Sequence, residues 1–168
     1  CTFYRWNGDV PDGQEKQATL VFSALEPRSV TAQFALNYFV TTNGNDSADG
    51  RSWETARATL QSALADTVTG DALLVSNGVY AVTNQIAITN GVWVRSVNGP
   101  ETTVIQRTVG GDRQVLLRHP EAVFDGFTIT RATGGAAYID HAGTLSNCII
   151  SNNVSPNNTI NGTVWLEG

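Results

Sequence analysis

Two histidines and the charged residues beside them are the side chains with the clearest capacity for chemistry. His119 and His141 lie 22 residues apart, and they follow Arg118 and Asp140 respectively. Paired imidazoles could bind a metal ion or act as general acid and base. A catalytic metal site ordinarily has three protein ligands, and only Asp140 and Glu121 are near in sequence. We therefore favour a surface ladder of side chains, with a metal site as the alternative.

A polar loop near the start of the chain offers a second candidate metal site. Residues 45–50 alternate oxygen-bearing side chains and have Gly at the sixth place, as in a calcium loop. The Glu expected at the twelfth place is Ala56 instead. We interpret the segment as a turn, and a structural Ca²⁺ site using Asp46 and Asp49 is the alternative. No other cofactor is indicated.

Composition excludes several classes of protein. The chain has 168 residues, of which 41% are hydrophobic and 15% charged, with a formal net charge of −5. It is too apolar for a disordered chain and too lightly charged for a coiled coil. It lacks the basic patches of a nucleic-acid-binding protein. No apolar run is long enough to span a membrane, and two cysteines cannot form a disulfide framework.

From Ala72 onward the chain is a series of short apolar segments separated by Gly, Asn, Asp or Thr. Few two-residue hairpin turns join them, which is not typical of a sandwich. A jelly-roll sandwich is the alternative fold. The predicted strands are Leu73–Val75, Ile86–Ile88, Val92–Val94, Val104–Ile105, Val115–Leu117, Val123–Phe124, Phe127–Ile129, Ala137–Ile139, Leu145, Cys148–Ile150 and Val164–Leu166.

An internal repeat accounts for this spacing. Residues 115–119 align with residues 137–141, an offset of 22, and residues 124–130 align with residues 145–151, an offset of 21. Three short strands in each repeat of this length predict a parallel β-helix, whose coils stack about 4.8 Å apart.

The same alignment places particular side chains on neighbouring coils. Arg118 should lie under Asp140 as an exposed ion pair worth about 0–1 kcal/mol. Gly126 falls on Asn147, and both residue types tolerate a left-handed backbone at a tight corner. Cys148 falls on an interior position, so we expect an inert core thiol.

One amphipathic helix is predicted between the polar loop and the first of these strands. Ser52 is a suitable N-cap, and Glu54 would lie in the first turn, where a negative charge suits the helix dipole. Gly70 ends the segment. A solenoid has an apolar end that needs covering, so we expect the helix to cap the first coil. Its apolar face comprises Trp53, Ala56, Leu60, Ala63 and Leu64.

Residues 1–35 are expected to form a separate small β module, with strands at Thr2–Trp6, Ala18–Phe22 and Ser29–Phe34. Three such strands bury little core, so we expect the C-terminal part of a larger module. The segments 6–10 and 28–34 resemble the end of a divergent InlB-type B-repeat, found along bacterial surface and secreted proteins. That resemblance implies a spacer or display role.

Within residues 36–168, a series of short segments occurs in a set order: Tyr38, Gly44–Ser47, Gly50, Ser52–Trp53, Thr55–Ala56, Thr59–Gln61, Gly78–Tyr80, Gly91–Val92, Val94–Ser96, Asn98–Ile105 and Asp125–Ile129. By these segments the region resembles the N-terminal portion of a right-handed parallel β-helix of the pectin lyase-like superfamily. This family includes lyases, hydrolases, epimerases and non-catalytic adhesins, and one fold hosts many activities. The resemblance implies an all-β solenoid, truncated at its C-terminus, with an N-terminal capping helix.

The family's lyases hold Ca²⁺ with clustered carboxylates while a nearby Arg or Lys takes a proton beside the substrate carboxylate. Here the resemblance points to Asp125, Asp140 and Arg131, with His141 as a further acid or base. Asp125 also suits a turn, and Arg131 is expected to face solvent. No dense acidic cluster accompanies them, so the sequence does not decide whether the protein is an enzyme.

We therefore expect a monomeric fragment of a secreted or cell-surface bacterial protein that acts on or binds polysaccharide. Its active coils would lie beyond Gly168, and Trp93 and Tyr138 are candidates for stacking on sugar rings. The alternative is a non-catalytic adhesin or surface-display protein. Cys1 and the absence of Met indicate an internal fragment, with a lipidated Cys1 as the alternative.

Overall fold

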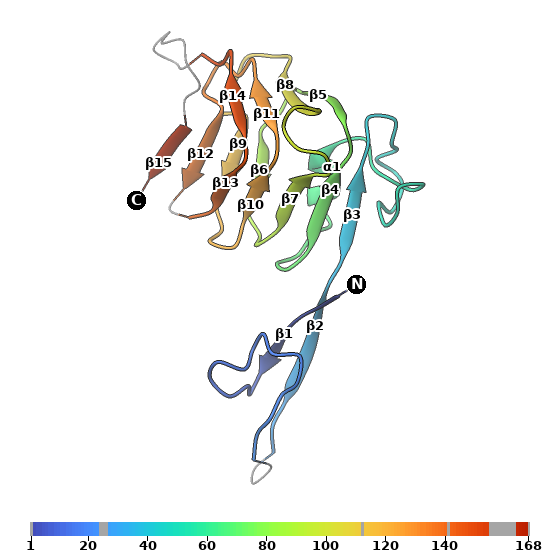
Figure 1. Ribbon diagram of the computed structural model, residues 1–168, viewed down its shortest axis with the longest axis vertical. Helices are drawn as coiled ribbons and strands as arrows, with labels where there is room; N and C mark the ends of the chain where they lie inside the picture. Colours follow the sequence, from blue (N-terminus) through green and yellow to red (C-terminus); the bar gives the residue numbers. More distant parts are fainter. Residues whose placement is uncertain (1, 24–26, 112, 141, 155–163, 168) are drawn as a thin grey trace. The chain divides into compact units, whose positions relative to one another are not determined.

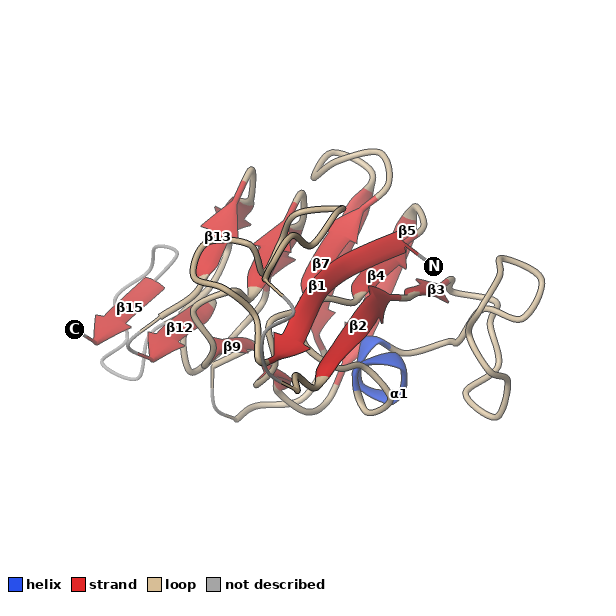
Figure 2. Ribbon diagram, turned by 90° about the horizontal axis from the view of Figure 1, so that it is seen from below, coloured by secondary structure: helices blue, strands red, loops and turns tan. Residues whose placement is uncertain are grey.

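The computed structural model describes residues 2–23, 27–111, 113–140, 142–154 and 164–167. Strands dominate these residues, and the helical part is a single short segment (Figures 1 and 2). The chain forms two compact units, residues 1–36 and residues 37–168.

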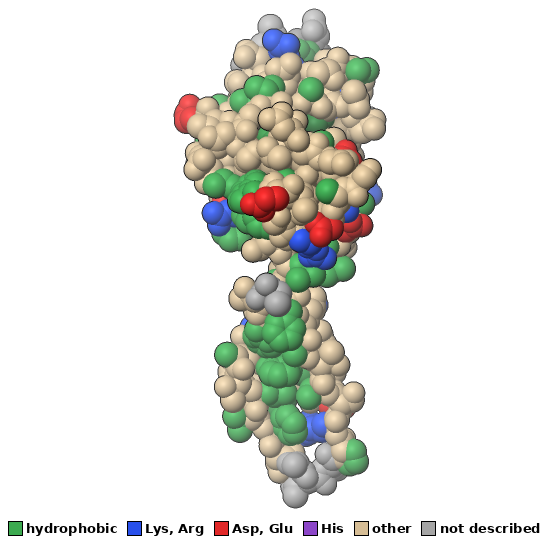
Figure 3. Space-filling model, turned by 90° about the vertical axis from the view of Figure 1, so that its right-hand side faces the viewer, with side chains coloured by type: hydrophobic (Ala, Val, Ile, Leu, Met, Phe, Trp, Pro, Cys, Tyr) green, Lys and Arg blue, Asp and Glu red, His purple; other side chains and the backbone are tan. Residues whose placement is uncertain are grey.

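The first unit is a two-stranded antiparallel sheet of β1 (Thr2–Gly8) and β2 (Val30–Ala35). Phe3 pairs with Phe34 across the strands, and the Phe3 ring also lies 5.2 Å from that of Trp6. Figure 3 shows hydrophobic side chains gathered over this sheet. None of its described residues is buried, so the aromatic cluster packs on one side only.

The strand predicted at Ala18–Phe22 is wrong. These residues form bends and extended chain that pair with no strand among the described residues. Val21 and Phe22 are 68% and 38% exposed, and the Val21 backbone N–H donates to the Gln14 side chain. Apolar, β-prone residues form a strand only where a partner edge supplies the ladder hydrogen bonds.

The second unit is a β-solenoid whose strands stack in three parallel sheets. The first sheet has β3 (Asn37–Val40), β4 (Ala72–Val75), β7 (Trp93–Ser96), β10 (Val123–Asp125) and β13 (Thr144–Ser146). The second has β5 (Gly78–Val82), β8 (Thr103–Arg107), β11 (Thr128–Thr130) and β14 (Ile149–Ser151). The third has β6 (Ile86–Ile88), β9 (Val115–Leu117), β12 (Ala137–Asp140) and β15 (Val164–Glu167).

The strand registers confirm the predicted repeat. Leu116 on β9 pairs with Tyr138 on β12, an offset of 22, and Phe124 on β10 pairs with Leu145 on β13, an offset of 21. β9 runs parallel to both β6 and β12, which excludes the jelly-roll alternative. The chain therefore returns to the same three sheets on every turn.

The core lies inside the coils, where like positions stack along the solenoid. Leu73, Val94 and Phe124 are adjacent in register on the first sheet, and all three are fully buried. The Phe124 ring stacks on that of Phe127, with centroids 4.2 Å apart. Burying a side chain of this size is worth about 1.5–3 kcal/mol. Side chains become more exposed at the last coil. On the third sheet, Leu117, Ile139 and Leu166 are adjacent in register, and Leu166 on the last strand is 76% exposed whereas Leu117 is fully buried.

Tight corners join the first sheet to the second. Gly126 and Asn147 both have positive φ, at 82° and 46°, which confirms their predicted equivalence. At the next corner the buried Asn153 side chain donates to the Ile129 carbonyl and accepts from the Ala132 N–H. An internal amide thus satisfies backbone groups that the turn leaves without ladder partners.

The helix is shorter and begins later than predicted. α1 spans Leu60–Leu64, and its N-cap is Thr59, whose hydroxyl accepts from the Ser62 N–H, rather than Ser52. Before it, the backbone of Arg57 makes a parallel bridge to Val40, so this segment is extended and cannot be helical. Buried Leu60 anchors α1 against β3, β4 and β6.

Candidate functional site

A column of outward-facing side chains runs across the third sheet. Strand alternation and register place Ala87, Leu116, Tyr138 and Trp165 in one row, one on each successive strand. The side chains enlarge along the row, and Trp165 is 41% exposed. We call these four residues the outer column. Its last two members, Tyr138 and Trp165, are part-exposed aromatic side chains on neighbouring strands.

Arg113 completes this surface. Its guanidinium carbon lies 4.3 Å from the centroid of the Tyr138 ring and 5.7 Å from that of Trp165. Stacking on aromatic faces holds a guanidinium flat while leaving its N–H groups directed sideways. The described residues offer its Nε no hydrogen-bond partner, although this atom is shielded from solvent. The outer column and Arg113 thus combine two rings with an oriented cation.

An ion pair lies on the same sheet, at the ends of β9 and β12. Arg118 pairs with Asp140 on the next coil, as the repeat predicted. The Arg118 side chain is 56% exposed, so solvent screens the pair and leaves it worth about 0–1 kcal/mol. His119 follows, and its Nδ1 accepts from the Glu121 N–H at 3.1 Å. His141 lies outside the described residues, so the predicted histidine pair stays a prediction.

The three remaining acid–base candidates do not share a face. Asp125 lies on the outer side of the first sheet, where its register partner on the preceding coil is Arg95. Asp140 lies on the third sheet, and Arg131 occupies the corner between the second and third sheets, exposed and with φ of 61°. Carboxylates on different sides of a coil cannot act together on one glycosidic bond.

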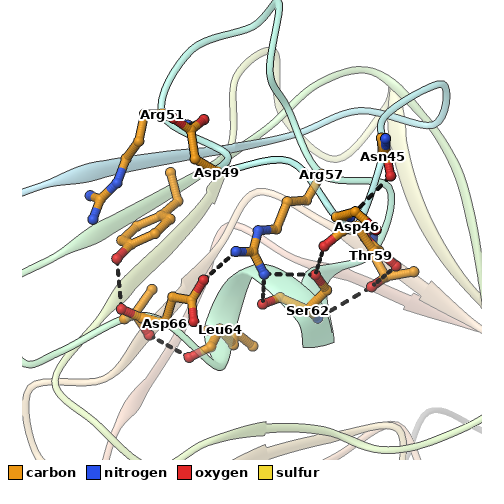
Figure 4. A network of polar contacts seen from close by, with 12 residues as sticks. Asn45, Asp46, Asp49, Arg51, Arg57, Thr59, Ser62, Leu64 and Asp66 are labelled. Atoms are coloured by element: carbon orange, nitrogen blue, oxygen red, sulfur yellow. Dashed lines mark hydrogen bonds and ion pairs between the residues drawn. The ribbon is translucent and has the colours of Figure 1, made fainter.

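The loop that precedes α1 uses its acidic residues structurally (Figure 4). One carboxylate oxygen of Asp46 accepts from the Ala58 and Thr59 N–H groups, and the other accepts from the Thr59 hydroxyl. Burial raises the pKa of Asp46, but these hydrogen bonds outweigh it and hold that pKa below its ordinary value. The carboxylate of Asp49 accepts from the Arg51 N–H. The proposed calcium site therefore has its Asp46 oxygens already engaged.

Arg57 ties the same loop to α1, as Figure 4 shows. It donates to the Ser62 carbonyl at 2.7 Å and to the Ser62 hydroxyl at 2.9 Å, and it pairs with Asp66. Beside it, the Arg51 guanidinium lies 4.0 Å from the ring centroid of Tyr38. These contacts make residues 41–59 a compact, anchored loop.

Two other sequence candidates have clear positions. Trp93 is 43% exposed on the outer side of the first sheet, and Arg95 lies 4.8 Å from its ring centroid. Cys148 donates to the Ser146 carbonyl, and burial raises the pKa of its thiol, as expected of an unreactive core cysteine.

Sequence reasoning missed a pocket beside Trp53. This pocket is lined by Trp53, Ser76, Asn77, Val97 and Asn98. The signal was a second repeat, Asn77-Gly78 and Asn98-Gly99, 21 residues apart and each following a first-sheet strand. Assigning Trp53 to the buried face of a helix concealed its relation to them.

The described residues contain neither a cluster of metal-ligating side chains nor a membrane-spanning helix. Among the described residues, no group of three or more His, Cys, Asp or Glu side chains could hold a metal ion. Nor does the described part of the chain contain a helix with the length and apolar character that crossing a bilayer requires.

Comparison with known proteins gives no family assignment, because no protein-family model, no curated protein sequence and no solved structure matches this chain.

Proposed function

We propose that this chain binds polysaccharide through the outer column of the third sheet, with Arg113 as its charged contact. The supporting observation is the stack of one guanidinium on two aromatic rings that successive coils hold in register. Flat apolar faces suit the C–H faces of sugar rings, and a fixed guanidinium donates to hydroxyls or to a sugar carboxylate.

An acidic polysaccharide suits this surface best. Arg113 offers donors in a rigid fork that matches the two oxygens of a carboxylate. The guanidinium is already oriented by Tyr138 and Trp165, so little conformational entropy is lost when it binds. Uronate-containing polymers such as polygalacturonate combine such a carboxylate with a ring that can stack.

The coils described bind rather than cleave in this proposal. Asp125 and Asp140 lie on different sheets, which favours the adhesin or surface-display alternative for this part of the protein. The N-terminal unit supports the same alternative, because a two-stranded sheet without buried residues is typical of part of a larger module. A B-repeat-like spacer role and a secreted or cell-surface location are parts of the proposal.

The finer fold assignment is also proposed. We infer a right-handed solenoid of the pectin lyase-like type, since connections between parallel strands of one sheet are right-handed in about 98% of cases. We further infer that α1 caps the first coil, because it packs against β3 and β6, the first strands of two sheets.

Binding to polygalacturonate tests the function directly. Affinity electrophoresis should show retardation of the whole chain by the polymer, and Trp165→Ala or Arg113→Ala should weaken binding about tenfold. Trp93→Ala is the matched control, because it removes an equally exposed indole that also stacks on an arginine. Unchanged retardation in both the Trp165→Ala and the Arg113→Ala variants would overturn the proposed site. New unsaturated or reducing ends would show that the chain is catalytic.

A further inference from the structure

The pocket beside Trp53 lies at the corner between the first and second sheets, away from the third sheet and its outer column. It has a volume of about 350 Å³ and is lined by Trp53, Ser76, Asn77, Val97 and Asn98. That volume falls at the lower end of the range of about 300–1,000 Å³ found for small-molecule sites. Among the described residues that line it, no side chain is charged.

The anchored loop fixes the indole that forms one wall. The Phe39 N–H donates to the Gly50 carbonyl, and the Arg57 N–H donates to the Phe39 carbonyl, so the loop closes onto β3. The Trp53 ring packs edge-on against Phe39, with centroids 4.7 Å apart. Although so held, Trp53 is 43% exposed. An exposed indole kept in one orientation is suited to stacking on a ligand.

Two asparagines on successive corners also line the pocket. The Val97 N–H donates to the Val75 carbonyl, which places the corner after β7 directly on the corner after β4. The Asn98 side chain then donates to the Asn77 Oδ1 at 2.8 Å, and the Thr102 hydroxyl donates to the same oxygen. The coil repeat therefore holds both amides in fixed orientations.

These contacts leave hydrogen-bonding groups unused. Within the described residues, the Asn77 Nδ2 donor, the Asn98 Oδ1 acceptor and the Trp53 indole N–H have no protein partner. Asn77 and Asn98 are both exposed, so these groups are accessible to a ligand. The pocket thus combines an apolar ring face and the apolar Val97 with neutral donors and an acceptor.

We propose that this pocket binds a pyranose ring of a neutral glycan. A pyranose has an apolar C–H face for the indole and equatorial hydroxyls that both donate and accept for the two amides. A phosphate, carboxylate or ammonium group would find no opposite charge among the lining residues. The site goes beyond the proposed outer-column function and does not depend on it, since the two use different sheets and different ligand chemistry.

Indole N–H signals in an NMR titration can report on both sites at once. The chain has four tryptophans, and loss of one signal in each of Trp53→Ala, Trp93→Ala and Trp165→Ala assigns three of them. Cellohexaose and a neutral galactan oligosaccharide are the probes, with trigalacturonate as the charged comparison. We expect at least one neutral probe to shift the Trp53 signal and leave the Trp93 signal in place.

The variants decide whether the pocket is the cause. Asn98→Ala removes one amide without touching the indole, and it should weaken binding of the neutral probe about tenfold. Trp53→Ala should have the same effect when its affinity is measured by isothermal titration calorimetry, since this variant lacks the reporting signal. Trp93→Ala should leave the affinity unchanged. The proposal would be overturned if neither neutral probe moved the Trp53 signal at probe concentrations up to tens of millimolar. Binding with a dissociation constant above about 10 mM is marginal. If trigalacturonate alone shifts the Trp53 signal, the proposal that the ligand is a neutral glycan is wrong.

The two proposals fail separately in this experiment. Trigalacturonate acting at the outer column should move the Trp165 signal, whereas a neutral glycan in the pocket should move the Trp53 signal. Should Trp53→Ala not fold, Asn98→Ala still tests the pocket, because its side chain is exposed at a corner and its substitution removes no core contact.

Discussion

The solenoid and the N-terminal two-stranded sheet are both β structure, yet they bury their side chains to very different extents. In the solenoid, Leu73, Val94 and Phe124 stack on one another and are fully buried. In the described part of residues 1–36 no side chain is buried, and Phe34 is 52% exposed despite its contact with Phe3.

The difference follows from the number of layers that each arrangement provides. A coil turns back on itself, so each of its three sheets covers the inner faces of the other two. A two-stranded sheet has no second layer, and one such sheet alone is marginally stable in water. Strand propensity alone therefore does not make a core. Closure of the chain around an interior does.

The largest expected effect is from core truncation. Phe124→Ala removes a fully buried ring stacked on Phe127, so we expect a loss of about 3–5 kcal/mol in the free energy of unfolding. Phe34→Ala in the two-stranded sheet should cost less than about 1 kcal/mol, because its ring is half exposed. Urea denaturation measures both. Equal costs would show that the first unit is packed as tightly as the coils.

A buried amide should matter more than an exposed one. Asn153→Ala leaves the Ile129 carbonyl and the Ala132 N–H without their partner at a buried corner, and we expect a loss of about 2–3 kcal/mol. Asn7→Ala is the control, because its amide bonds the Gln33 side chain in an exposed setting and should cost a few tenths of a kcal/mol. Thermal unfolding of both variants compares them, and a neutral Asn153→Ala would contradict this role.

The loop carboxylate should give a pH-dependent contribution. The pKa of Asp46 lies below its ordinary value of 3.8, because hydrogen bonds from Thr59 and Ala58 outweigh the effect of burial. A lowered folded pKa adds stability above the unfolded value and loses it as the pH falls through the folded value. Asp46→Asn should therefore lower the free energy of unfolding at pH 7 by less than about 1 kcal/mol, because solvent screens this exposed carboxylate, and the difference should shrink below about pH 4.

Denaturation of both proteins between pH 7 and about pH 2 tests this behaviour. Asp9→Asn is the control from the two-stranded sheet, where an exposed carboxylate accepts a single backbone N–H. A wild-type advantage that persists unchanged at the acid end would contradict the assigned role of Asp46.

The smallest expected effect is that of the ion pair between coils. A double-mutant cycle with Arg118→Ala and Asp140→Ala should give a coupling of about 0.2–0.5 kcal/mol that falls with added salt, since Arg118 is largely exposed. The Arg5–Gln33 contact in the two-stranded sheet joins a cation to a neutral amide, so its coupling should depend on salt much less than that of the ion pair. A coupling above about 2 kcal/mol would show that the pair is shielded from solvent.

The coil repeat could be predicted from the sequence because it is encoded locally. Short apolar segments recur at offsets of 21 and 22, and residues able to adopt positive φ recur with them at Gly126 and Asn147. Parallel stacking in register follows from that periodicity. The pairing of Arg118 with Asp140 needed nothing beyond the same alignment.

Long-range contacts decided the features that the sequence analysis missed. The spacing from Trp53 to Leu64 suits a helix, yet the bridge between Arg57 and Val40 holds the first part of that segment extended and moves the helix start to Leu60. A partner 17 residues away outweighed local propensity, because helix propensities differ by less than about 1 kcal/mol per residue.

The two candidate binding surfaces also depend partly on features that the sequence determined and partly on contacts that only the tertiary structure decided. The sequence by itself determined that this chain forms stacked coils and that Tyr138 lies one coil beyond Leu116. Only the tertiary structure placed Arg113 on Tyr138 and Trp165, and Trp53 beside Asn77 and Asn98. Periodicity fixes which residues stack on neighbouring strands, but loops and corners have no period. Where their side chains meet the sheets depends on how the whole chain packs.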